Sequence, residues 1–428
     1  MEMDNLYQEF LKSDGVSIDS RTIKPNQIFF ALPGTKNDGS DFAHEALDKG
    51  ARLVILQNKP LKDHVKFIQV KSVIETLQAL ASSHRDHLTI PVIGITGSVG
   101  KTTTKELIAT VLGAQFNAFF TLGNLNNHIG VPISILSIQP EHQIAIIEMG
   151  ANHIGEIADL CAIAKPTFGL ITRIGKAHIE GFGSLEGVII AKSDLYRYIR
   201  DHHGTVFIDV QDPMIFNVSK GFDMEKINIH QAFQYKLISA QPNIILDLKD
   251  ESEWIRLTTL IPGDYNLSNI LMALAVGKYF TIPLQKMTDA LSRYENKSNR
   301  SQLISLGTNQ ILLDAYNANP TSMMAAIESF AAWNTAGNQK IVMLGDMKEM
   351  GTEALAEHQK IHDLLLQKTF DQVCLIGTTF SQTKSLNDRF MYFENVDALR
   401  AWYQQQSFQH SYILIKASRG MTLEKVLT

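Results

Sequence analysis

Cysteine is scarce in this 428-residue chain, which has only Cys161 and Cys374, far apart in the sequence. Two such cysteines without metal-type spacing argue against a disulfide framework and indicate buried thiols in a reducing compartment. Long apolar runs are also missing, since none approaches the roughly 18–20 residues that a membrane-spanning helix needs. The first residues are amphipathic and acidic, without the basic start and apolar centre of a signal peptide. We therefore expect a cytoplasmic protein.

Basic charge is not in excess, because 39 lysines and arginines stand against 44 acidic residues, giving a net charge of −5. Nucleic-acid binding usually leaves a basic footprint, so this balance argues against nucleic acid as the main partner. Apolar residues make up 45% of the chain and charged residues 19%, which is typical of a globular protein. The length exceeds what one core usually needs, and we expect two or three domains.

The most informative segment reads GITGSVGKTTT (94–104) and follows an apolar run at 90–93. Glycines let backbone N–H groups close around phosphate oxygens, the lysine adds a positive charge, and a threonine hydroxyl can hold Mg²⁺. The segment predicts a nucleotide-binding loop between a buried strand and a helix. Its spacing is unusual, because Ile95 stands where the common phosphate loop has its first glycine. The alternative is an ordinary strand-turn-helix with a chance lysine, which the run of three threonines disfavours.

Local patterns divide the chain into three α/β parts, over residues 1–85, 86–296 and 297–428. Strands are expected from short apolar runs at 28–32, 52–56, 143–148, 168–172, 310–314, 340–346, 372–377 and 411–416. Helices are expected at 42–49, 185–199, 269–279, 320–333 and 353–366. Alternating apolar residues at 205–257 indicate a β-rich stretch. The third part reads as a doubly wound α/β domain.

Three residues of the second part have both a functional and an ordinary interpretation. Glu148 ends an apolar strand, where a carboxylate commonly reaches Mg²⁺ beside bound phosphates; the alternative is an exposed strand-end acid. His178 follows an apolar strand, at the edge where open sheets bind ligands, although a lone loop histidine is more often structural. Lys192 lies in an expected helix and, taken alone, is a solvated lysine.

Polar loops offer further candidates. Three asparagines within residues 124–127 suit either a turn or the recognition of sugar and peptide groups. Asp314 can accept hydrogen bonds from a ribose, or it is a strand-end acid before the helix that Asn319 would cap. Arg300 and Arg419 suit phosphate or carboxylate contact, although a lone loop arginine is more often a surface residue.

Taken together, these segments resemble the Mur ligase family over nearly the whole chain. The resemblance is carried by GNLNNHIGVP (123–132), EMGANHIGEI (148–157), AHIEGFGS (177–184), DAYNANPTSM (314–323), LGDMKEMG (344–351) and KASRGM (416–421). DSR (19–21) and NDGSDF (37–42) resemble the uridine-nucleotide domain of the family. The loop at 96–102 resembles the family's own phosphate loop, which accounts for the missing first glycine. Two positions depart from the family pattern, Leu313 and Asn299.

The resemblance implies three domains: a small α/β domain that binds UDP-MurNAc (1–85), a central ATP-binding domain with a mainly parallel sheet and an added β section (86–296), and a Rossmann-like α/β domain (297–428). It implies an ATP-dependent amide ligase of peptidoglycan synthesis. Within the family, it points to the members that join D-alanyl-D-alanine to UDP-MurNAc-tripeptide through an acyl phosphate. A monomer without membrane insertion or nucleic acid is expected, as is a large domain closure.

Site residues follow from the same resemblance. Those implied on ATP are Gly97, Ser98, Val99, Gly100, Lys101, Thr102, Thr103, Asn269, Arg300 and Asp314. Two Mg²⁺ ions would be held by Thr102, Glu148, His178 and Lys192, the last as a carbamate formed with CO2. The residues implied in catalysis are Lys101, Glu148, His178 and Lys192. Ser20 and Arg21 would meet the uridine diphosphate, and Asn124 and Asn127 would face the muramoyl peptide. The 416–419 segment would lie near the cleft.

Other functions stay open at this point. A relative that adds a single amino acid to a UDP-muramoyl acceptor, or a folylpolyglutamate-type ligase, would share most of these motifs. A phosphate-loop switch or motor would need no uridine domain, so the motifs at 19–21 and 37–42 argue against it. A non-catalytic nucleotide-binding scaffold would have no need of Lys101, Glu148, His178 and Lys192.

Overall fold

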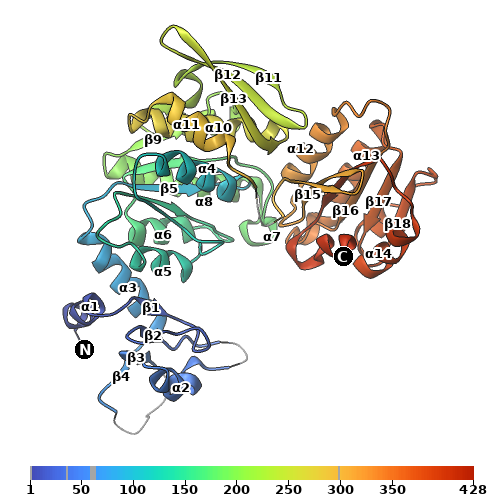
Figure 1. Cartoon of the computed structure of the whole chain (residues 1–428). Coiled ribbons are helices and arrows are strands. Elements are labelled where there is room, and N and C mark those ends of the chain that lie inside the picture. Colours follow the sequence, from blue (N-terminus) through green and yellow to red (C-terminus); the bar gives the residue numbers. More distant parts are fainter. Residues whose placement is uncertain (1, 35–36, 58–63, 297–298) are drawn as a thin grey trace.

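The computed structural model describes residues 2–34, 37–57, 64–296 and 299–428. The chain forms three α/β domains, each built on its own sheet (Figure 1). The N-terminal domain lies below the central domain in this view, and the C-terminal domain lies beside the central one. The predicted fold class, with a parallel central sheet and an α/β C-terminal domain, is confirmed. The predicted domain boundaries stay predictions, and the second falls next to residues 297–298, outside the described residues.

The N-terminal domain has a four-stranded parallel sheet in the order β1-β2-β3-β4. Its elements are α1 (Met3–Leu11), β1 (Val16–Ser17), β2 (Ile28–Phe30), η1 (Gly39–Phe42), α2 (Ala43–Asp48), β3 (Leu53–Leu56), β4 (Phe67–Gln69) and α3 (Val73–Asp86). The helix α3 also packs against α5 and α6 of the central domain. Arg85, near its end, donates hydrogen bonds to the carbonyls of Ala164 and Lys165, so this helix joins the two domains.

The central domain has a six-stranded sheet in the order β10-β9-β8-β5-β7-β6, with every pair parallel. Its strands are β5 (Val92–Thr96), β6 (Ala118–Phe120), β7 (Ile144–Glu148), β8 (Phe168–Ile171), β9 (Thr205–Ile208) and β10 (Glu225–Asn228). Its helices are α4 (Lys101–Gly113), α5 (Gly130–Leu136), α6 (Glu156–Ala164), α7 (Ile179–Phe182), α8 (Leu185–Asp201) and α9 (Pro213–Lys220). Because β5 lies between β7 and β8, the loops that follow these three strands meet at one edge of the sheet.

An antiparallel sheet of three strands completes this domain: β11 (Gln234–Ser239), β12 (Asn243–Asp250) and β13 (Glu253–Pro262). The chain then continues through η3 (Asp264–Asn266), α10 (Leu267–Tyr279) and α11 (Leu284–Ser292). The β-rich interpretation of residues 205–257 is incomplete, because the stretch contains α9 and the 3-10 turn η2 (Ile229–Gln231). Asp212 accepts hydrogen bonds from the first N–H groups of α9, ahead of Pro213. An acidic N-cap before proline is a helix-start signal that could have been used.

The C-terminal domain has a six-stranded sheet in the order β14-β15-β19-β16-β17-β18, antiparallel only at β14. Its strands are β14 (Gln302–Leu306), β15 (Asn309–Asp314), β16 (Lys340–Gly345), β17 (Gln372–Ile376), β18 (Phe390–Phe393) and β19 (Tyr412–Lys416). Its helices are α12 (Pro320–Ala331), η4 (Gly351–Glu353), α13 (Ala354–Gln367), η5 (Phe380–Gln382), α14 (Val396–Gln405), η6 (Arg419–Met421) and η7 (Leu423–Leu427). The sequence predicts four of these strands and misses β14 and β18, the two partly exposed edge strands.

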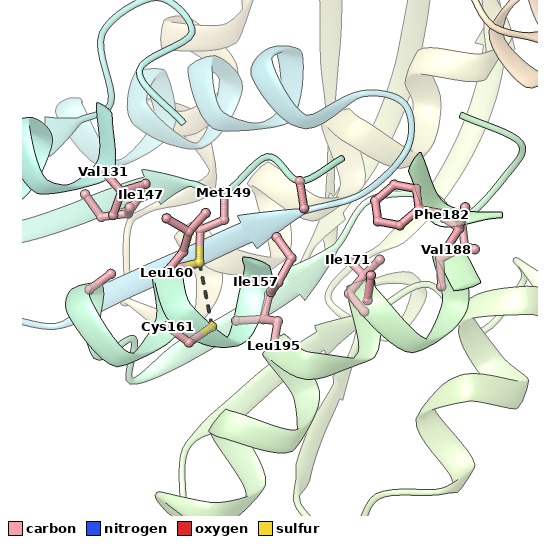
Figure 2. Close-up of a cluster of buried hydrophobic side chains, with 14 of the residues drawn as sticks. Val131, Ile147, Met149, Ile157, Leu160, Cys161, Ile171, Phe182, Val188 and Leu195 are labelled. Carbon is pink, nitrogen blue, oxygen red and sulfur yellow. Dashed lines mark hydrogen bonds between the residues drawn. The ribbon is translucent and has the colours of Figure 1, made fainter. Parts of the chain in front are cut away.

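The core beneath the central sheet includes Met149, Leu160, Cys161 and Leu195 (Figure 2). The Sγ atom of Cys161 lies 3.7 Å from the Sδ atom of Met149. Both cysteines of the chain are buried free thiols, as the sequence predicts, and burial raises the pKa of each well above its usual value. Among the described residues, no helix is long and apolar enough to cross a membrane.

Candidate active site

A cavity of about 820 Å³ is lined by all three domains. Gln78 of α3 lies at one side of it, and the phosphate loop and Glu148 contribute from the central domain. Arg300 and Asp314 line it from the C-terminal domain. Ligand sites of open parallel sheets lie outside the carboxyl ends of the strands, which is where this cavity meets β5 and β7.

The phosphate loop connects β5 to the first turn of α4. Gly97 and Gly100 have φ angles of +148° and +88°, which other residues rarely adopt. A Cβ atom on Gly97 would lie 2.1 Å from Thr172 Oγ1, so only glycine fits there. Lys101 begins α4 and donates from Nζ to the Gly97 carbonyl over 2.7 Å. Burial lowers the pKa of Lys101, and the N-terminus of α4 lies at the cavity, as an anion site requires.

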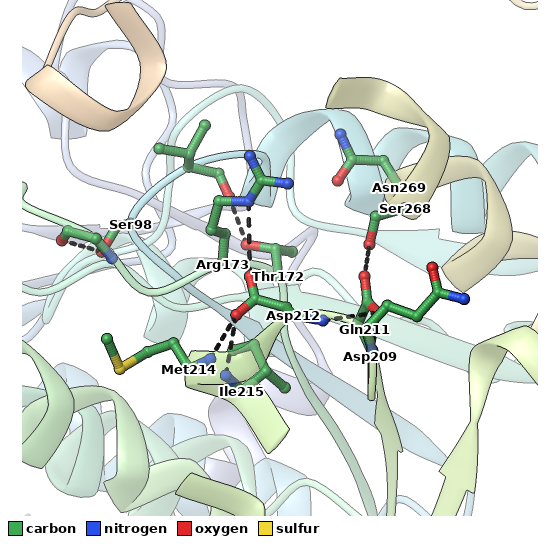
Figure 3. Close-up of polar contacts among 12 residues, drawn as sticks. Ser98, Thr172, Arg173, Asp209, Gln211, Asp212, Met214, Ile215, Ser268 and Asn269 are labelled. Carbon is green, nitrogen blue, oxygen red and sulfur yellow. Dashed lines mark hydrogen bonds and ion pairs between the residues drawn. The ribbon is translucent and has the colours of Figure 1, made fainter. Parts of the chain in front are cut away.

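The loop that follows β8 fixes the phosphate loop from the side. Thr172 Oγ1 donates to the Val99 carbonyl over 2.6 Å, and Ser98 Oγ donates to the Gly175 carbonyl over 2.9 Å. Figure 3 shows Thr172 beside Arg173, whose Nε lies 3.8 Å from a carboxylate oxygen of Asp212. Hydrogen bonds from the loop after β8 therefore help to fix the conformation of the phosphate loop.

Glu148 ends β7 with a fully buried carboxylate, which contradicts the interpretation as an exposed strand-end acid. Thr102 Oγ1 donates to its Oε1 over 3.1 Å, and Asn126 Nδ2 donates to the same atom over 2.8 Å. The Nζ atom of the equally buried Lys105 lies 3.5 Å from Oε2, which accepts no hydrogen bond from the described residues. Neither Lys105 nor the role of Asn126 is predicted from the sequence.

Asn124 and Asn127 both line the cavity, and so does Asn269. Asn127 Oδ1 accepts hydrogen bonds from the N–H groups of Ile129 and Gly130, so this residue also shapes the turn before α5. Asn269 Oδ1 accepts from Thr104 Oγ1 over 3.0 Å, which ties α10 to α4 beside the phosphate loop. The turn and the binding interpretations of the asparagine run are thus compatible.

His178 lines the cavity at the start of α7, and its Nδ1 atom lies 2.5 Å from Glu349 Oε2 of the C-terminal domain. Lys192 of α8 is 2% exposed, so it is not the solvated lysine that its position in the sequence suggests. Its Nζ atom lies 3.5 Å from the Ala151 carbonyl and 5.2 Å from the centre of the Phe182 ring. Burial lowers the pKa of Lys192 well below its usual value, with a smaller contribution from Lys101.

The C-terminal residues predicted on ATP face the same cavity. The Arg300 guanidinium lies 3.5 Å from the centre of the Tyr316 ring. Asp314 Oδ2 accepts from Lys416 Nζ over 2.5 Å, and its Oδ1 accepts from the Ser301 N–H over 3.1 Å. Lys416 was predicted only as part of a segment near the cleft, yet it is buried and lines the cavity.

Five predicted residues are not among those that line this cavity: Gly97, Lys192, Ser20, Arg21 and Arg419. Arg21 is exposed and pairs with Asp19, which lowers the pKa of Asp19 to about 2. Ser20 is buried in the same domain, and its Oγ donates to Glu45 Oε2 over 3.4 Å. Arg419 pairs with Glu424 at the end of the chain. The uridine role of Ser20 and Arg21 stays a prediction.

Family models match most of the chain. The Mur ligase family, catalytic domain, matches residues 12–85, and the Mur ligase middle domain matches residues 95–277. The Mur ligase, glutamate ligase domain, matches residues 299–419. Two curated relatives carry the name UDP-N-acetylmuramoyl-tripeptide–D-alanyl-D-alanine ligase. The one from Bacillus subtilis is 33% identical and covers 96% of this chain and 92% of its own. The one from Escherichia coli is 31% identical and covers 97% and 93%.

Solved structures give the same likeness. MurF from Acinetobacter baumannii superposes with a TM-score of 0.86 at 26% identity, covering 98% of this chain and 97% of its own. MurF ligase from Thermotoga maritima in complex with ADP has a TM-score of 0.85 over the same shares, and at 24% identity it supports the fold alone.

Proposed function

This chain belongs to the Mur ligase family, and from that premise we propose that it joins D-alanyl-D-alanine to UDP-N-acetylmuramoyl-tripeptide, using ATP, in peptidoglycan synthesis. The observation that carries the proposal is the shared cavity: the phosphate loop, the C-terminal Arg300 and Asp314, and Gln78 of the N-terminal side all line one space. A ligase of two substrates and a nucleotide needs such a space, whereas a phosphate-loop switch does not.

The reaction begins at the tripeptide carboxylate, which is a poor electrophile. One of its oxygens attacks the γ-phosphorus of ATP, and the bond to the β,γ-bridging oxygen breaks, giving an acyl phosphate and ADP. The dipeptide amine then attacks the acyl carbon, and phosphate and one proton leave as the amide forms. Negative charge gathers in both steps, so fixed N–H groups and the Lys101 ammonium at the phosphates stabilise the transition states.

The residues beside the loop fit a magnesium ion. Mg²⁺ is usually held by one or two carboxylates together with phosphates and water, so it needs no larger protein cage. The Thr102 hydroxyl and the Glu148 carboxylate are 3.1 Å apart at the sheet edge, and Glu148 Oε2 has no hydrogen-bond partner among the described residues. They would hold the first ion, which offsets phosphate charge when bound. No group of three or more His, Cys, Asp or Glu side chains in the described parts of the chain could hold a metal.

Lys192 and His178 would hold a second Mg²⁺ ion. A carbamate forms when a neutral amine attacks CO2 and releases a proton, and the lowered pKa of Lys192 favours that neutral amine. The product is an anion that can hold Mg²⁺ where an ammonium cannot. His178 lines the cavity at the start of α7 and would help to hold the same ion.

The remaining assignments follow the family resemblance, and those of Asn269, Asp314, Arg300, Asn124 and Asn127 are supported by the position of these residues in the cavity. Asn269, next to Gly100, would contact the adenine, and Asp314 would approach the ribose together with Arg300. Asn124 and Asn127 would face the muramoyl peptide. Ser20 and Arg21 would meet the uridine diphosphate in the N-terminal domain.

The first prediction tests the reaction itself. Purified protein is given ATP, Mg²⁺, UDP-MurNAc-tripeptide and D-Ala-D-Ala, and phosphate release is measured with each acceptor omitted in turn. We expect release to need both acceptors, because the dipeptide amine is what resolves the acyl phosphate. Single amino acids, and glutamate with a folate, serve as competing acceptors. Equal phosphate release without the dipeptide, or faster release with a single amino acid than with D-Ala-D-Ala, would contradict the proposed function.

The second prediction concerns domain movement. ATP contacts are proposed from both the central and the C-terminal domain, so binding is expected to draw these domains together. Small-angle scattering should show a smaller radius of gyration when a non-hydrolysable ATP analogue and UDP-MurNAc-tripeptide are both present. The same curves report the molecular mass, which tests the expected monomer. An unchanged radius with both ligands bound would contradict closure.

A further inference from the structure

His178 donates a hydrogen bond to a residue outside its own domain. Its partner Glu349 lies between β16 and η4 of the C-terminal domain, with 2.5 Å between Nδ1 and Oε2. An ionised carboxylate only accepts hydrogen bonds, so the Nδ1 atom of His178 must carry the proton. In a neutral ring, this leaves Nε2 with its lone pair. The partner therefore decides which nitrogen of His178 can accept or coordinate.

Further contacts dock the two loops against each other. The Glu180 N–H donates to the Glu349 carbonyl over 3.3 Å. Lys176 Nζ donates to Glu353 Oε2 over 2.6 Å and to Glu357 Oε1 over 2.9 Å. The partner of His178 is thus present only while the C-terminal domain is docked on the central one.

Backbone geometry supports the same conclusion. His178 and Glu349 have φ angles of +53° and +63°, in the left-handed region that residues other than glycine rarely occupy. Such conformations persist where the surroundings determine them, and they cluster at functional sites. Glu349 is 55% exposed, so its pair with His178 adds little to stability. The contact between Glu349 and His178 is therefore better explained by orientation of the His178 ring than by stabilisation of the fold.

We propose that Glu349 is a positioning residue: it fixes the Nδ1–H tautomer and the ring orientation of His178, and thereby couples His178 to docking of the C-terminal domain. This inference rests on the proposed function for the part that His178 plays in the reaction. Partners of this kind, which hold a ligand histidine from behind, commonly change metal affinity or activity by about 10–100-fold when they are removed.

The test compares Glu349→Ala, Glu349→Asp and Glu353→Gln in the full chain. Alanine keeps the Cβ atom, so the left-handed backbone costs the same, but the acceptor is lost. Aspartate keeps a carboxylate, and Glu353→Gln removes a charge from the same docking surface without touching His178. The ring ¹⁵N shifts of His178, assigned by their loss in His178→Gln, report the tautomer without any substrate. Phosphate release with both acceptors gives kcat and KM.

In Glu349→Ala we expect the tautomer of His178 to become mixed and kcat to fall about 10–100-fold, with the KM for D-Ala-D-Ala unchanged. Glu349→Asp should recover part of the Nδ1–H tautomer and part of kcat, and Glu353→Gln should keep the Nδ1–H tautomer of His178. An unchanged tautomer in Glu349→Ala would overturn the proposal, as would a mixed tautomer with full kcat. If Glu349→Ala does not fold, Glu349→Leu, which also lacks an acceptor, carries the same comparison. Failure of the wild-type protein to ligate would instead reject the proposed function, because the ring shifts need no turnover.

Discussion

Replacement of Lys192 by alanine is expected to lower kcat by on the order of 10²–10³-fold, and acetate is expected to restore part of the loss. The Lys192 side chain is 2% exposed, and its Nζ atom lies 3.5 Å from the carbonyl oxygen of Ala151. No ion pair with a carboxylate is found for it among the described residues, and burial lowers the pKa of Lys192 well below its usual value. A neutral amine is the form that reacts with CO2.

The control for this prediction is Lys192→Met, which fills the same volume but cannot become a carbamate. Alanine leaves a space that a short carboxylate can enter, so acetate should raise the kcat of Lys192→Ala and not that of Lys192→Met. Phosphate release is measured at saturating substrates, with chloride as the ionic-strength control. Full activity in either variant would remove the carbamate from the mechanism. Rescue of both variants alike would show that acetate acts elsewhere.

The strands that surround the site can be predicted from the sequence, because they are buried on both faces. β5, β7 and β19 each appear as a continuous apolar run, which is the pattern of a central parallel strand. The edge strands β14 and β18 expose part of their side chains and carry no such run. The helix α9 was missed for another reason, since it interrupts a stretch whose flanking segments do alternate. Edge and capping signals are weaker than burial, which accounts for the missed strands β14 and β18 and the missed helix α9.

The site residues that belong to sequence motifs can also be predicted from the sequence. Lys101 follows β5 and Glu148 ends β7, and because these strands lie side by side, the meeting of the two residues at one edge of the sheet could be predicted. The residues that hold them could not, because those contacts come from elements far apart in the chain. Asn126 reaches Glu148 from the loop before α5, and Glu349 reaches His178 from another domain. Such pairs depend on how domains pack, which local patterns do not contain.

Lys105 is a buried lysine that no local sequence pattern explains, and its replacement is also expected to have a large effect. It lies on α4, one turn after Lys101, and its Nζ atom donates to the Gly123 carbonyl over 3.1 Å. The same atom lies 3.5 Å from Glu148 Oε2, and each side chain is 1% exposed. It therefore offers the only positive charge that contacts Glu148 among the ion pairs of the described residues. Its loss would leave a buried carboxylate that Thr102 and Asn126 can bond but not neutralise.

Replacement of Lys105 by methionine is expected to destabilise the central domain by about 3–5 kcal/mol, since removal of one partner leaves a buried charge uncompensated. The double variant Lys105→Met/Glu148→Gln should recover much of this loss, because an amide keeps the hydrogen-bond acceptor without the charge. Native-state hydrogen exchange at the amides of β5 and β7 measures the opening free energy of this sheet separately from the other domains. The control is Lys286→Met, at an exposed lysine of α11, which should change this opening free energy by no more than about 0.5 kcal/mol. An equal loss in the single and the double variant would mean that Lys105 stabilises the fold by packing its stem, and that Glu148 does not depend on its charge.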